Sequence, residues 1–504
     1  MQNGIAEWDN EQKAVKERIT LISEQIRNDF SVVEPLGVGG VGVVLRVQDL
    51  NLDCPRALKF PRPKSGREDV FAEIVSSEIS SLKEAIHPSI IEIYRHGAVN
   101  LDNNKIPYYI MEFVPDAVDA YEYFKSGNRD VGLLRGVIKQ AVDGIRVLHE
   151  RDIIHGDVKL ENVLVSASGR AVISDLGSAR KLTGEPQRTF LIFTRQYAHP
   201  SLIALASTST DPNRIRAEDI DRSKLSKSFD LYALGKNLLR MLDFYDPVSH
   251  KYLDPYTRKF LSLMACRLLD GQNADSECAL GLPRAAFGEI KYTSISEVAI
   301  DINKITGEYY LQRMVPEMDQ NGVKTIQTSS LSPTPFSSAL NAVLSSPAFR
   351  RLAAISQLGL VSLVYPTATH SRMEHALGTF TNAVRYCIAL YNDPINPLFR
   401  QIMNDKDLKA VLLAALCHDI GQYPHAHDLE EAEPNIFAHK DIGVAMLNGE
   451  IKSPATQALR EDIRKYWDVS PDRVAQIIAA DPTNLDSPIK DRILHTIIDG
   501  PIDA

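Results

Sequence analysis

The stretch His155-Gly156-Asp157-Val158-Lys159-Leu160-Glu161-Asn162 decides the fold of the first half of this chain. A second acidic motif, Asp175-Leu176-Gly177, follows it, and the strand-like run Arg56-Ala57-Leu58-Lys59-Phe60 precedes it. A lysine on a strand can bind phosphate groups when a helix carboxylate holds it, and Glu78 lies in such a helical segment. Polar residues in this order are hard to explain as solvated surface. We therefore predict that Lys59 binds phosphate groups and that Glu78 holds it.

A glycine-rich segment, Gly37-Val38-Gly39-Gly40-Val41-Gly42, lies upstream of these motifs. Glycines without side chains let backbone amides approach phosphate oxygens. In a dinucleotide-binding fold such a segment joins a strand to a helix, but here strand-like sequence lies on both sides and Val44 follows shortly after. The segment therefore favours a phosphate-binding loop between two strands.

The hydrophobic pattern divides the chain into domains. Residues 11–27 place apolar side chains (Val15, Ile19, Ile22 and Ile26) at helical spacing, which predicts an amphipathic packing or docking helix. From Phe30 short β-branched runs surround one helical segment at 69–85, and helical periods dominate beyond Asp130. The sequence is hairpin-like around Thr306-Gly307 and almost entirely helical from about residue 336. We predict an N-terminal helix at 1–28, an α+β domain at 29–290, a linker with a hairpin at 291–335 and an all-α domain at 336–504.

In their order and gaps, the motifs of the first domain resemble those of protein kinases, which implies a bilobal fold with a β-rich N-lobe and a helical C-lobe. The resemblance implies that Asp157 accepts or orients the substrate hydroxyl proton, that Lys159 neutralises the γ-phosphate, and that Asn162 and Asp175 hold Mg²⁺. Met111-Glu112-Phe113-Val114 resembles the hinge that binds adenine, and Lys159 is similar to the lysine of the serine/threonine class. The implied ATP-binding residues are Gly37, Gly39, Gly40, Gly42, Val44, Ala57, Lys59, Glu78, Met111, Glu112, Val114, Asn162 and Asp175.

Two positions depart from the kinase pattern. Gly156 stands where kinases usually carry an arginine that pairs with an activation-loop phosphate, so phosphorylation of Thr189 or Thr194 is not expected to switch the enzyme on. Ser201 in Tyr197-Ala198-His199-Pro200-Ser201 replaces the glutamate of the Ala-Pro-Glu motif, whereas Asp230 resembles the buried aspartate of helix αF. We expect constitutive or partner-controlled activity. A pseudokinase that only binds ATP is the alternative.

The helical C-terminal region contains a second set of polar residues within apolar sequence. His375 lies in Arg372-Met373-Glu374-His375, and the adjacent His418 and Asp419 end the run Leu412-Leu413-Ala414-Ala415-Leu416-Cys417. Burying ionisable groups costs free energy unless they are paired or bind a metal. Imidazoles with a carboxylate suit a divalent metal that keeps open positions for water and phosphate oxygens. The alternative is a hydrogen-bonded His–Asp pair in the core.

This region resembles the HD phosphohydrolase superfamily, and most closely its deoxynucleoside triphosphate triphosphohydrolase branch, from Phe349-Arg350-Arg351-Leu352 to about His439. The resemblance implies that His375, His418 and Asp419 are metal ligands and that His427 is a catalytic histidine. It further implies substrate contacts from Gln357 and Leu358 to sugar and base, from Arg372 to phosphate, and from His439 on the phosphate side.

Three features depart from that branch. Gln422 and Glu430 replace a histidine and an aspartate of its pattern. The fourth metal ligand of the branch would directly follow Gly500-Pro501-Ile502-Asp503-Ala504, so we expect a domain truncated at its C-terminus.

Composition limits the classes of partner and compartment. The net charge is −9 and no dense Lys/Arg run occurs, which argues against a dedicated nucleic-acid surface. The five cysteines lack CxxC spacing, and the sequence has no apolar run long enough to span a bilayer, so we expect a cytoplasmic protein without a membrane partner.

The combined expectation is an ATP- and Mg²⁺-dependent kinase acting on serine or threonine of a protein substrate. It would be fused to a hydrolase of nucleotide phosphates that uses Mn, Fe, Zn or Mg. Two alternatives stay open from the sequence: a non-catalytic HD nucleotide sensor that switches the kinase, and a hydrolase with a pseudokinase scaffold. The oligomeric state is also open, and a homo-oligomer is compatible with the sequence.

Overall fold

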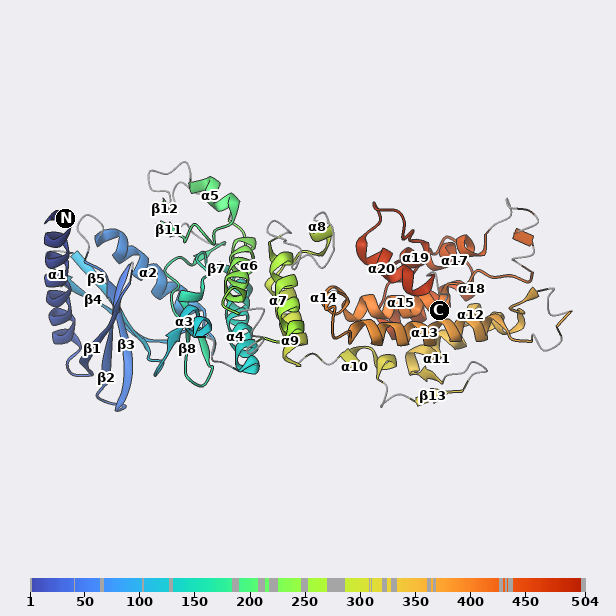
Figure 1. The fold of residues 1–504 in the computed structure, drawn as a ribbon, viewed down its shortest axis with the longest axis horizontal. Helices are drawn as coiled ribbons and strands as arrows, with labels where there is room; N and C mark the ends of the chain where they lie inside the picture. The colour runs from blue at the N-terminus through green and yellow to red at the C-terminus, as the bar shows by residue number, and fades with distance from the viewer. Residues whose placement is uncertain are drawn as a thin grey trace. The chain divides into compact units, whose positions relative to one another are not determined.

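The computed structural model describes residues 2–39, 41–63, 68–101, 104–126, 130–183, 190–206, 214–216, 225–245, 253–269, 286–307, 309, 311–319, 324–327, 333–359, 364–365, 369–425, 429–430, 433 and 438–499. The chain divides into two compact units, Met1–Thr306 and Gly307–Ala504 (Figure 1). Among these described residues, no helix combines the length and the apolar character that crossing a membrane requires.

The first unit begins with a five-stranded antiparallel sheet in the order β1-β2-β3-β5-β4. Its strands are β1 (Phe30–Val38), β2 (Gly42–Asp49), β3 (Cys54–Pro61), β4 (Ile93–Leu101) and β5 (Asn104–Glu112). Helix α1 (Gln2–Ile26) packs on one face of this sheet through Ile22 and Ile26, as the apolar spacing predicted. Helix α2 (Glu68–Glu84) packs on the other face through Val75 and Leu82. The two helices lie on opposite sides of the sheet in Figure 1.

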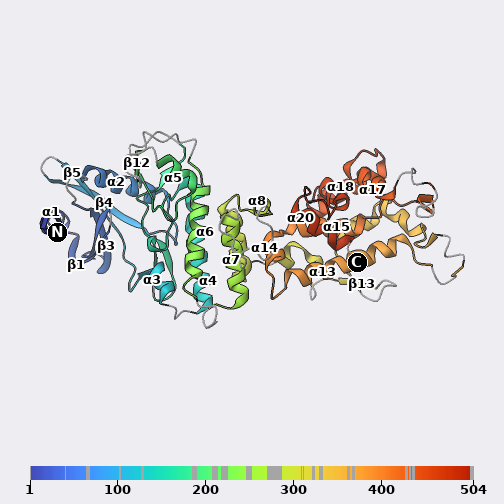
Figure 2. The same cartoon turned by 45° about the horizontal axis from the view of Figure 1, so that its top comes forward.

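A helical lobe follows the sheet in the same unit (Figures 1 and 2). Helix α4 packs on α9, and α6 packs on α7. Apolar side chains at helical spacing bury one stripe of each helix, for example Leu134, Ile138 and Ile145 on α4. The helices are α3 (Ala120–Lys125), α4 (Val131–Glu150), α5 (Pro200–Ala206), α6 (Ser228–Leu242), α7 (Pro255–Leu268), α8 (Ala286–Ile290) and α9 (Ile295–Thr306).

Short strands lie between the loops of this lobe. They form the three-stranded sheet β6-β8-β9 and the pairs β7–β10 and β11–β12. Their bounds are β6 (Val118–Asp119), β7 (Ile153–Ile154), β8 (Val163–Val165), β9 (Ala171–Ile173), β10 (Arg180–Lys181), β11 (Phe190–Ile192) and β12 (Arg214–Arg216), with a 3₁₀ turn at Leu160–Asn162. The stretch 155–162 therefore runs between β7 and β8. This α+β arrangement confirms the predicted fold class.

The predicted hairpin around Thr306-Gly307 is wrong. Residues Ile295–Thr306 form helix α9, whose buried Ile295, Val298 and Ile302 share one face against α4. Gly307 has φ +81, the left-handed conformation in which glycine commonly ends a helix. The linker predicted from residue 291 consequently begins later, because α9 belongs to the first unit. An antiparallel strand pair does occur further on, between β13 (Lys324–Ile326) and β14 (Thr334–Phe336).

Within its described residues, the second unit is mainly helical, as predicted, with that strand pair and one isolated β-bridge. Helix α13 packs on α15, and α19 packs on α15, α17 and α20 (Figure 1). Capping boxes begin α13, at Ser371 and Glu374, and α15, at Asn404 and Asp407. The helices are α10 (Leu311–Met314), α11 (Ser338–Ser345), α12 (Pro347–Arg350), α13 (Arg372–Tyr391), α14 (Leu398–Ile402), α15 (Asp405–Cys417), α17 (His439–Asn448), α18 (Pro454–Asp462), α19 (Pro471–Ala479) and α20 (Ile489–Ile498), with 3₁₀ turns at Pro316–Met318 and Arg351–Ala354 and a π turn at Ile463–Trp467.

Candidate functional site

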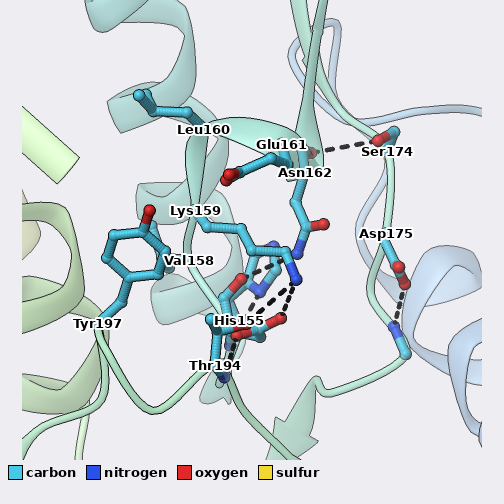
Figure 3. A network of polar contacts seen from close by, with 12 residues as sticks. His155, Val158, Lys159, Leu160, Glu161, Asn162, Ser174, Asp175, Thr194 and Tyr197 are labelled. Carbon is cyan, nitrogen blue, oxygen red and sulfur yellow. Dashed lines mark hydrogen bonds and ion pairs between the residues drawn. The ribbon is translucent and has the colours of Figure 1, made fainter. Parts of the chain in front are cut away.

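The first candidate site is centred on the loop between β7 and β8 (Figure 3). Lys159 Nζ lies 2.8 Å from Asp157 Oδ2 and donates to the Thr194 hydroxyl over 3.2 Å. The backbone N–H of Thr194 donates to Asp157 Oδ1 over 2.7 Å, and Asn162 Nδ2 donates to the Asp157 carbonyl over 2.9 Å. Figure 3 shows the amide oxygen of Asn162 directed to the side on which Asp175 lies. The loop therefore gathers a carboxylate, an ammonium and an amide around one point.

Helix α6 fixes the backbone of this loop through hydrogen bonds. The buried Asp230 accepts the backbone N–H of His155 over 2.8 Å and that of Gly156 over 2.9 Å, and His149 Nε2 lies 2.8 Å from the same carboxylate. Burial opposes the charge on Asp230, but these hydrogen bonds keep its pKa below the ordinary value. Gly156 has φ +80, a conformation that is strained for any residue with a Cβ. The sequence singled out both Asp230 and Gly156, but it did not predict that Asp230 binds the backbone N–H of Gly156.

Asn237 of α6 is a second support, which sequence reasoning missed. Its side chain accepts the N–H of Leu160 over 3.0 Å and donates to the Val158 carbonyl over 2.9 Å. Asn237 follows Asp230 by two helical turns, so both face the loop. A polar residue on an otherwise buried helix face was the signal that could have identified it.

The sheet contributes a cluster of three charged side chains next to the loop, in which Lys59 and Glu78 are buried and Asp175 is partly exposed. Lys59 Nζ lies 2.8 Å from Glu78 Oε2 and 3.4 Å from Asp175 Oδ1, so β3 and α2 meet the segment that follows β9. Burial opposes the charge on Lys59, but attraction by Asp175 and Glu78 raises its pKa above the ordinary value. Burial also raises the pKa of Glu78 to about 7, although Lys59 opposes this shift. Asp175 stays ionised because Lys59 and the N–H of Gly177 offset its burial and lower its pKa.

The predicted glycine loop lies at the edge of this cluster. The N–H of Gly39 donates to the Gly42 carbonyl over 2.8 Å, which closes the turn between β1 and β2. A Cβ on Gly42 would come within 2.9 Å of Lys59 Cε, so the lysine packs against this position. Val44 is paired in register with Lys59. Gly40 lies outside the described residues.

The predicted hinge spans the last two residues of β5 and the two residues after it. Met111 and Val114 are buried, as is Ala57 beside them in the sheet. Glu112 forms an ion pair with Arg170, and Arg170 Nη2 lies 3.0 Å from Glu112 Oε2. The Glu112 side chain therefore connects the sheet to the β8–β9 turn.

The second candidate site lies between the ends of α13 and α15 in the second unit. His375, His418 and Asp419 each place a ligand atom within 4.8 Å of the others. The Nε2 atoms of the two histidines are 3.2 Å apart. His418 Nδ1 donates to the Ala415 carbonyl over 2.9 Å, because a carbonyl can only accept, and its Nε2 lone pair is therefore available to a cation. Two imidazole nitrogens and a carboxylate fit a divalent transition metal.

An arginine and a histidine lie beside the carboxylate of this cluster. Arg372 Nη1 lies 2.9 Å from Asp419 Oδ2, and His439 Nε2 lies 3.5 Å from Asp419 Oδ1. Burial opposes the charge on Asp419, but His418, Arg372, His375 and His439 lower its pKa below the ordinary value. Arg372, the expected phosphate contact, forms an ion pair with Asp419. The structure thus adds an ion pair that the sequence did not predict.

His439 is held from its other side by Glu430. Its Nδ1 lies 3.0 Å from the Glu430 carboxylate, and its backbone N–H donates to the same group over 2.8 Å at the start of α17. Glu430, noted in the sequence only as a departure, therefore orients His439. His427 lies outside the described residues.

A cavity of about 330 Å³ opens beside the cluster, which is within the range for small-molecule sites. Gln357 lines it, whereas Leu358, expected beside Gln357, is not among its lining residues and is 39% exposed. Sequence reasoning missed several lining groups from α17 and α20. They are Lys440, His495 and Asp499.

Gly421 determines how closely α17 approaches the cluster. A Cβ at this position would overlap the His439 carbonyl and the Gly443 nitrogen, both backbone atoms. Gly421→Ala should therefore destabilise the second unit by about 1–3 kcal/mol or more, through forced backbone movement. Urea unfolding monitored by circular dichroism measures this cost. Gly378→Ala on α13 is the matched control, because a Cβ there meets open space and should be neutral or stabilising by up to about 1 kcal/mol. Equal stability of the two variants would contradict the packing argument.

Comparisons with known proteins agree with the division of the chain into two compact units. The family model "Protein kinase domain" matches residues 30–278, and "HD domain" matches residues 372–492. The meiosis-specific serine/threonine-protein kinase mek1 of Schizosaccharomyces pombe is 28% identical over 44% of this chain and 48% of its own length. PknB of Mycobacterium leprae, a serine/threonine-protein kinase, is 27% identical over 42% of this chain and 32% of its own length. The chain thus spans less than half the length of these curated relatives.

Among solved structures, the autoinhibited serine kinase domain of the giant muscle protein titin is similar at 18% identity, with a TM-score of 0.38, over 55% of this chain and 80% of that one.

Proposed function

Because the chain carries a protein kinase domain of the serine/threonine type followed by an HD domain, we propose that it transfers the γ-phosphoryl group of ATP to serine or threonine of a protein and hydrolyses a nucleotide phosphate. The observation that carries the kinase proposal is that the Lys59–Glu78–Asp175 cluster and the Asp157 loop are assembled together.

Each group in the first site has a role in this proposal. Lys59, held by Glu78, binds the α- and β-phosphates, and the hinge at Met111–Val114 binds adenine through its backbone. Asp157 accepts the proton of the acceptor hydroxyl, and Lys159 stabilises charge on the γ-phosphate. Asn162 and Asp175 offer oxygen ligands of the kind that Mg²⁺ prefers. Mg²⁺ would neutralise phosphate charge there.

The regulation of the kinase follows from Gly156. No arginine side chain extends from this position to hold a phosphorylated activation loop, and Thr194 is already bound to Asp157 and Lys159. We infer that phosphorylation of the activation loop is not required for activity. Thr189 lies outside the described residues.

The HD proposal rests on the His375–His418–Asp419 cluster beside the cavity. A divalent ion there would supply a water nucleophile at neutral pH and polarise a phosphate. Arg372 and Lys440 place positively charged side chains on the cavity wall beside His439, which suits an anionic substrate. Gln357 on the same wall supports a sugar contact, and we propose a deoxynucleoside triphosphate as substrate.

Two assays on the full chain test the two activities. Labelled phosphate from [γ-³²P]ATP should enter serine or threonine of the chain itself or of added proteins, as phosphoamino-acid analysis would show. Phosphate or triphosphate should be released from a deoxynucleoside triphosphate when Mn²⁺ is added. Tight nucleotide binding without release would instead support the sensor, and ATP binding without phosphoryl transfer would support the scaffold. The cysteines of the described residues (Cys54, Cys266, Cys387 and Cys417) form no disulfide with one another, which fits the proposed reducing cytoplasm.

Phosphoryl transfer should decline as the pH falls through about 7. Protonation removes the Glu78 charge that holds Lys59, and its pKa is raised to about 7. The ionised fraction of such a group falls about 10-fold between pH 8 and pH 6, and the initial rate should follow it. Glu78→Gln should start at a lower rate and lack this decline, as rates measured across that range with a constant-ionic-strength buffer would show. Parallel pH profiles of the two proteins would contradict the assignment to Glu78.

A further inference from the structure

The HD metal cluster is built from two elements that are far apart in the sequence. His375 lies on α13, whereas His418 and Asp419 end α15. The cluster binds a metal only if the start of α13 and the end of α15 keep a constant separation, because ligand geometry is held by the groups around the ligands.

One segment, residues 351–357, is bonded to both elements. On the α13 side, the N–H of Arg372 donates to the Ile355 carbonyl over 2.9 Å, and the N–H of Gln357 donates to the His370 carbonyl over 3.0 Å. Ser356 and Ser371 form a β-bridge between these two bonds. The segment is therefore fastened by its backbone to the residues that begin α13.

On the α15 side, the same segment is fastened by one side chain. Arg351 Nη2 donates to the Ile420 carbonyl and Nη1 to the Gln422 carbonyl, which are the acceptors on either side of Gly421. Ile420 and Gln422 are fully buried, so these carbonyls have no access to bulk water.

Arg351 is not among the residues that line the cavity, whereas the charged residues Arg372 and Lys440 are. Its two hydrogen-bond acceptors are backbone atoms of the turn that directly follows the metal ligands. Any influence on the metal must therefore pass through the position of that turn.

We infer that Arg351 is a positioning residue: it fixes the turn 420–422 to the segment 351–357 and thereby sets the position of His418 and Asp419 relative to His375. This inference rests on the proposed metal site of the HD domain. Loss of a group of this kind commonly weakens metal binding by 10–100-fold. The physical cause of the weaker binding is that, without Arg351, the buried carbonyls of Ile420 and Gln422 each lose a hydrogen-bond donor.

Titration of the full chain with Mn²⁺ in the absence of nucleotide, followed by electron paramagnetic resonance, tests the inference. Only the binding that disappears in His418→Ala is counted, which removes any contribution from the kinase site. Arg351→Ala should raise the dissociation constant of that binding at least about 10-fold, and Arg351→Lys should give an intermediate value because an ammonium offers a single point of attachment. The neighbouring Arg350 is exposed, so Arg350→Ala is the matched control and should bind Mn²⁺ as the wild type does.

Added guanidinium at non-denaturing concentration should partly restore Mn²⁺ binding to Arg351→Ala, which a general loss of stability would not allow. Wild-type affinity in Arg351→Ala and Arg351→Lys would overturn the positioning role while leaving the metal site intact. Absence of any His418-dependent binding in the wild type would overturn the proposed HD activity, and the inference with it. If Arg351→Ala does not fold, the comparison of Arg351→Lys with Arg350→Ala decides the question.

Discussion

Replacing Asp157 by asparagine should lower phosphoryl transfer from ATP by about 10²–10⁴-fold. An amide of the same size keeps one acceptor oxygen for the Thr194 N–H, but its NH₂ group can accept neither the bond from Lys159 nor the proton of the acceptor hydroxyl. General-base catalysis contributes an effect of this size. Initial rates of ³²P incorporation into protein measure the loss.

Binding of ATP should survive in Asp157→Asn, because Lys59, Glu78 and the hinge are untouched. Asp143→Asn serves as the matched control: this carboxylate lies on α4, where it pairs with Lys139 on the helix surface, and its loss should leave the rate unchanged. A normal transfer rate in Asp157→Asn would remove this residue from the proposed mechanism. Normal ATP binding with no transfer in the wild type would indicate the scaffold alternative.

Replacing His418 by alanine should reduce metal-dependent release of phosphate or triphosphate by more than about 100-fold. The Nε2 of His418 is one of the nitrogens of the cluster, and loss of a direct ligand should exceed the 10–100-fold effect that is typical of the groups around ligands. The quantities to compare are bound Mn²⁺ and product release at saturating nucleotide.

His370→Ala is the control for the second prediction. His370 lies just before α13 and contributes its carbonyl to Gln357, which the substitution preserves. Product release should therefore persist in this variant. Equal release by His418→Ala and the wild type would refute the assignment of the metal site, whereas nucleotide binding that persists without release in the wild type would favour the sensor.

Local sequence patterns were sufficient to predict candidate site residues where these residues neighbour each other in the sequence. The loop 155–162 and the pair His418-Asp419 were recognisable because their chemistry requires fixed short spacings. The α+β and helical classes of the two units followed from hydrophobic periodicity, since a strand and a helix bury residues at different intervals. The helix α1 was predictable for the same reason, because Ile22 and Ile26 lie on one face.

The end of α9 shows where a local pattern is ambiguous. Thr306-Gly307 reads as a hairpin turn, but a glycine with positive φ also terminates a helix. Only packing of Val298 and Ile302 against α4 distinguishes the two structures. A local sequence rule contains no information about that partner.

The sequence by itself indicated which residues are candidates for the chemistry, whereas the tertiary structure decided which groups hold them. Asp230 binding the amides of His155 and Gly156, Glu430 orienting His439, and Arg351 binding the turn after Asp419 were all absent from the sequence interpretation. Asp230 and Arg351 reach their partners across more than about fifty residues of chain, and Glu430 meets His439 only through the placement of α17. The physical reason is that a hydrogen bond to a backbone amide or carbonyl requires only a donor and an acceptor, so such partners are selected by the fold and leave no motif in the sequence.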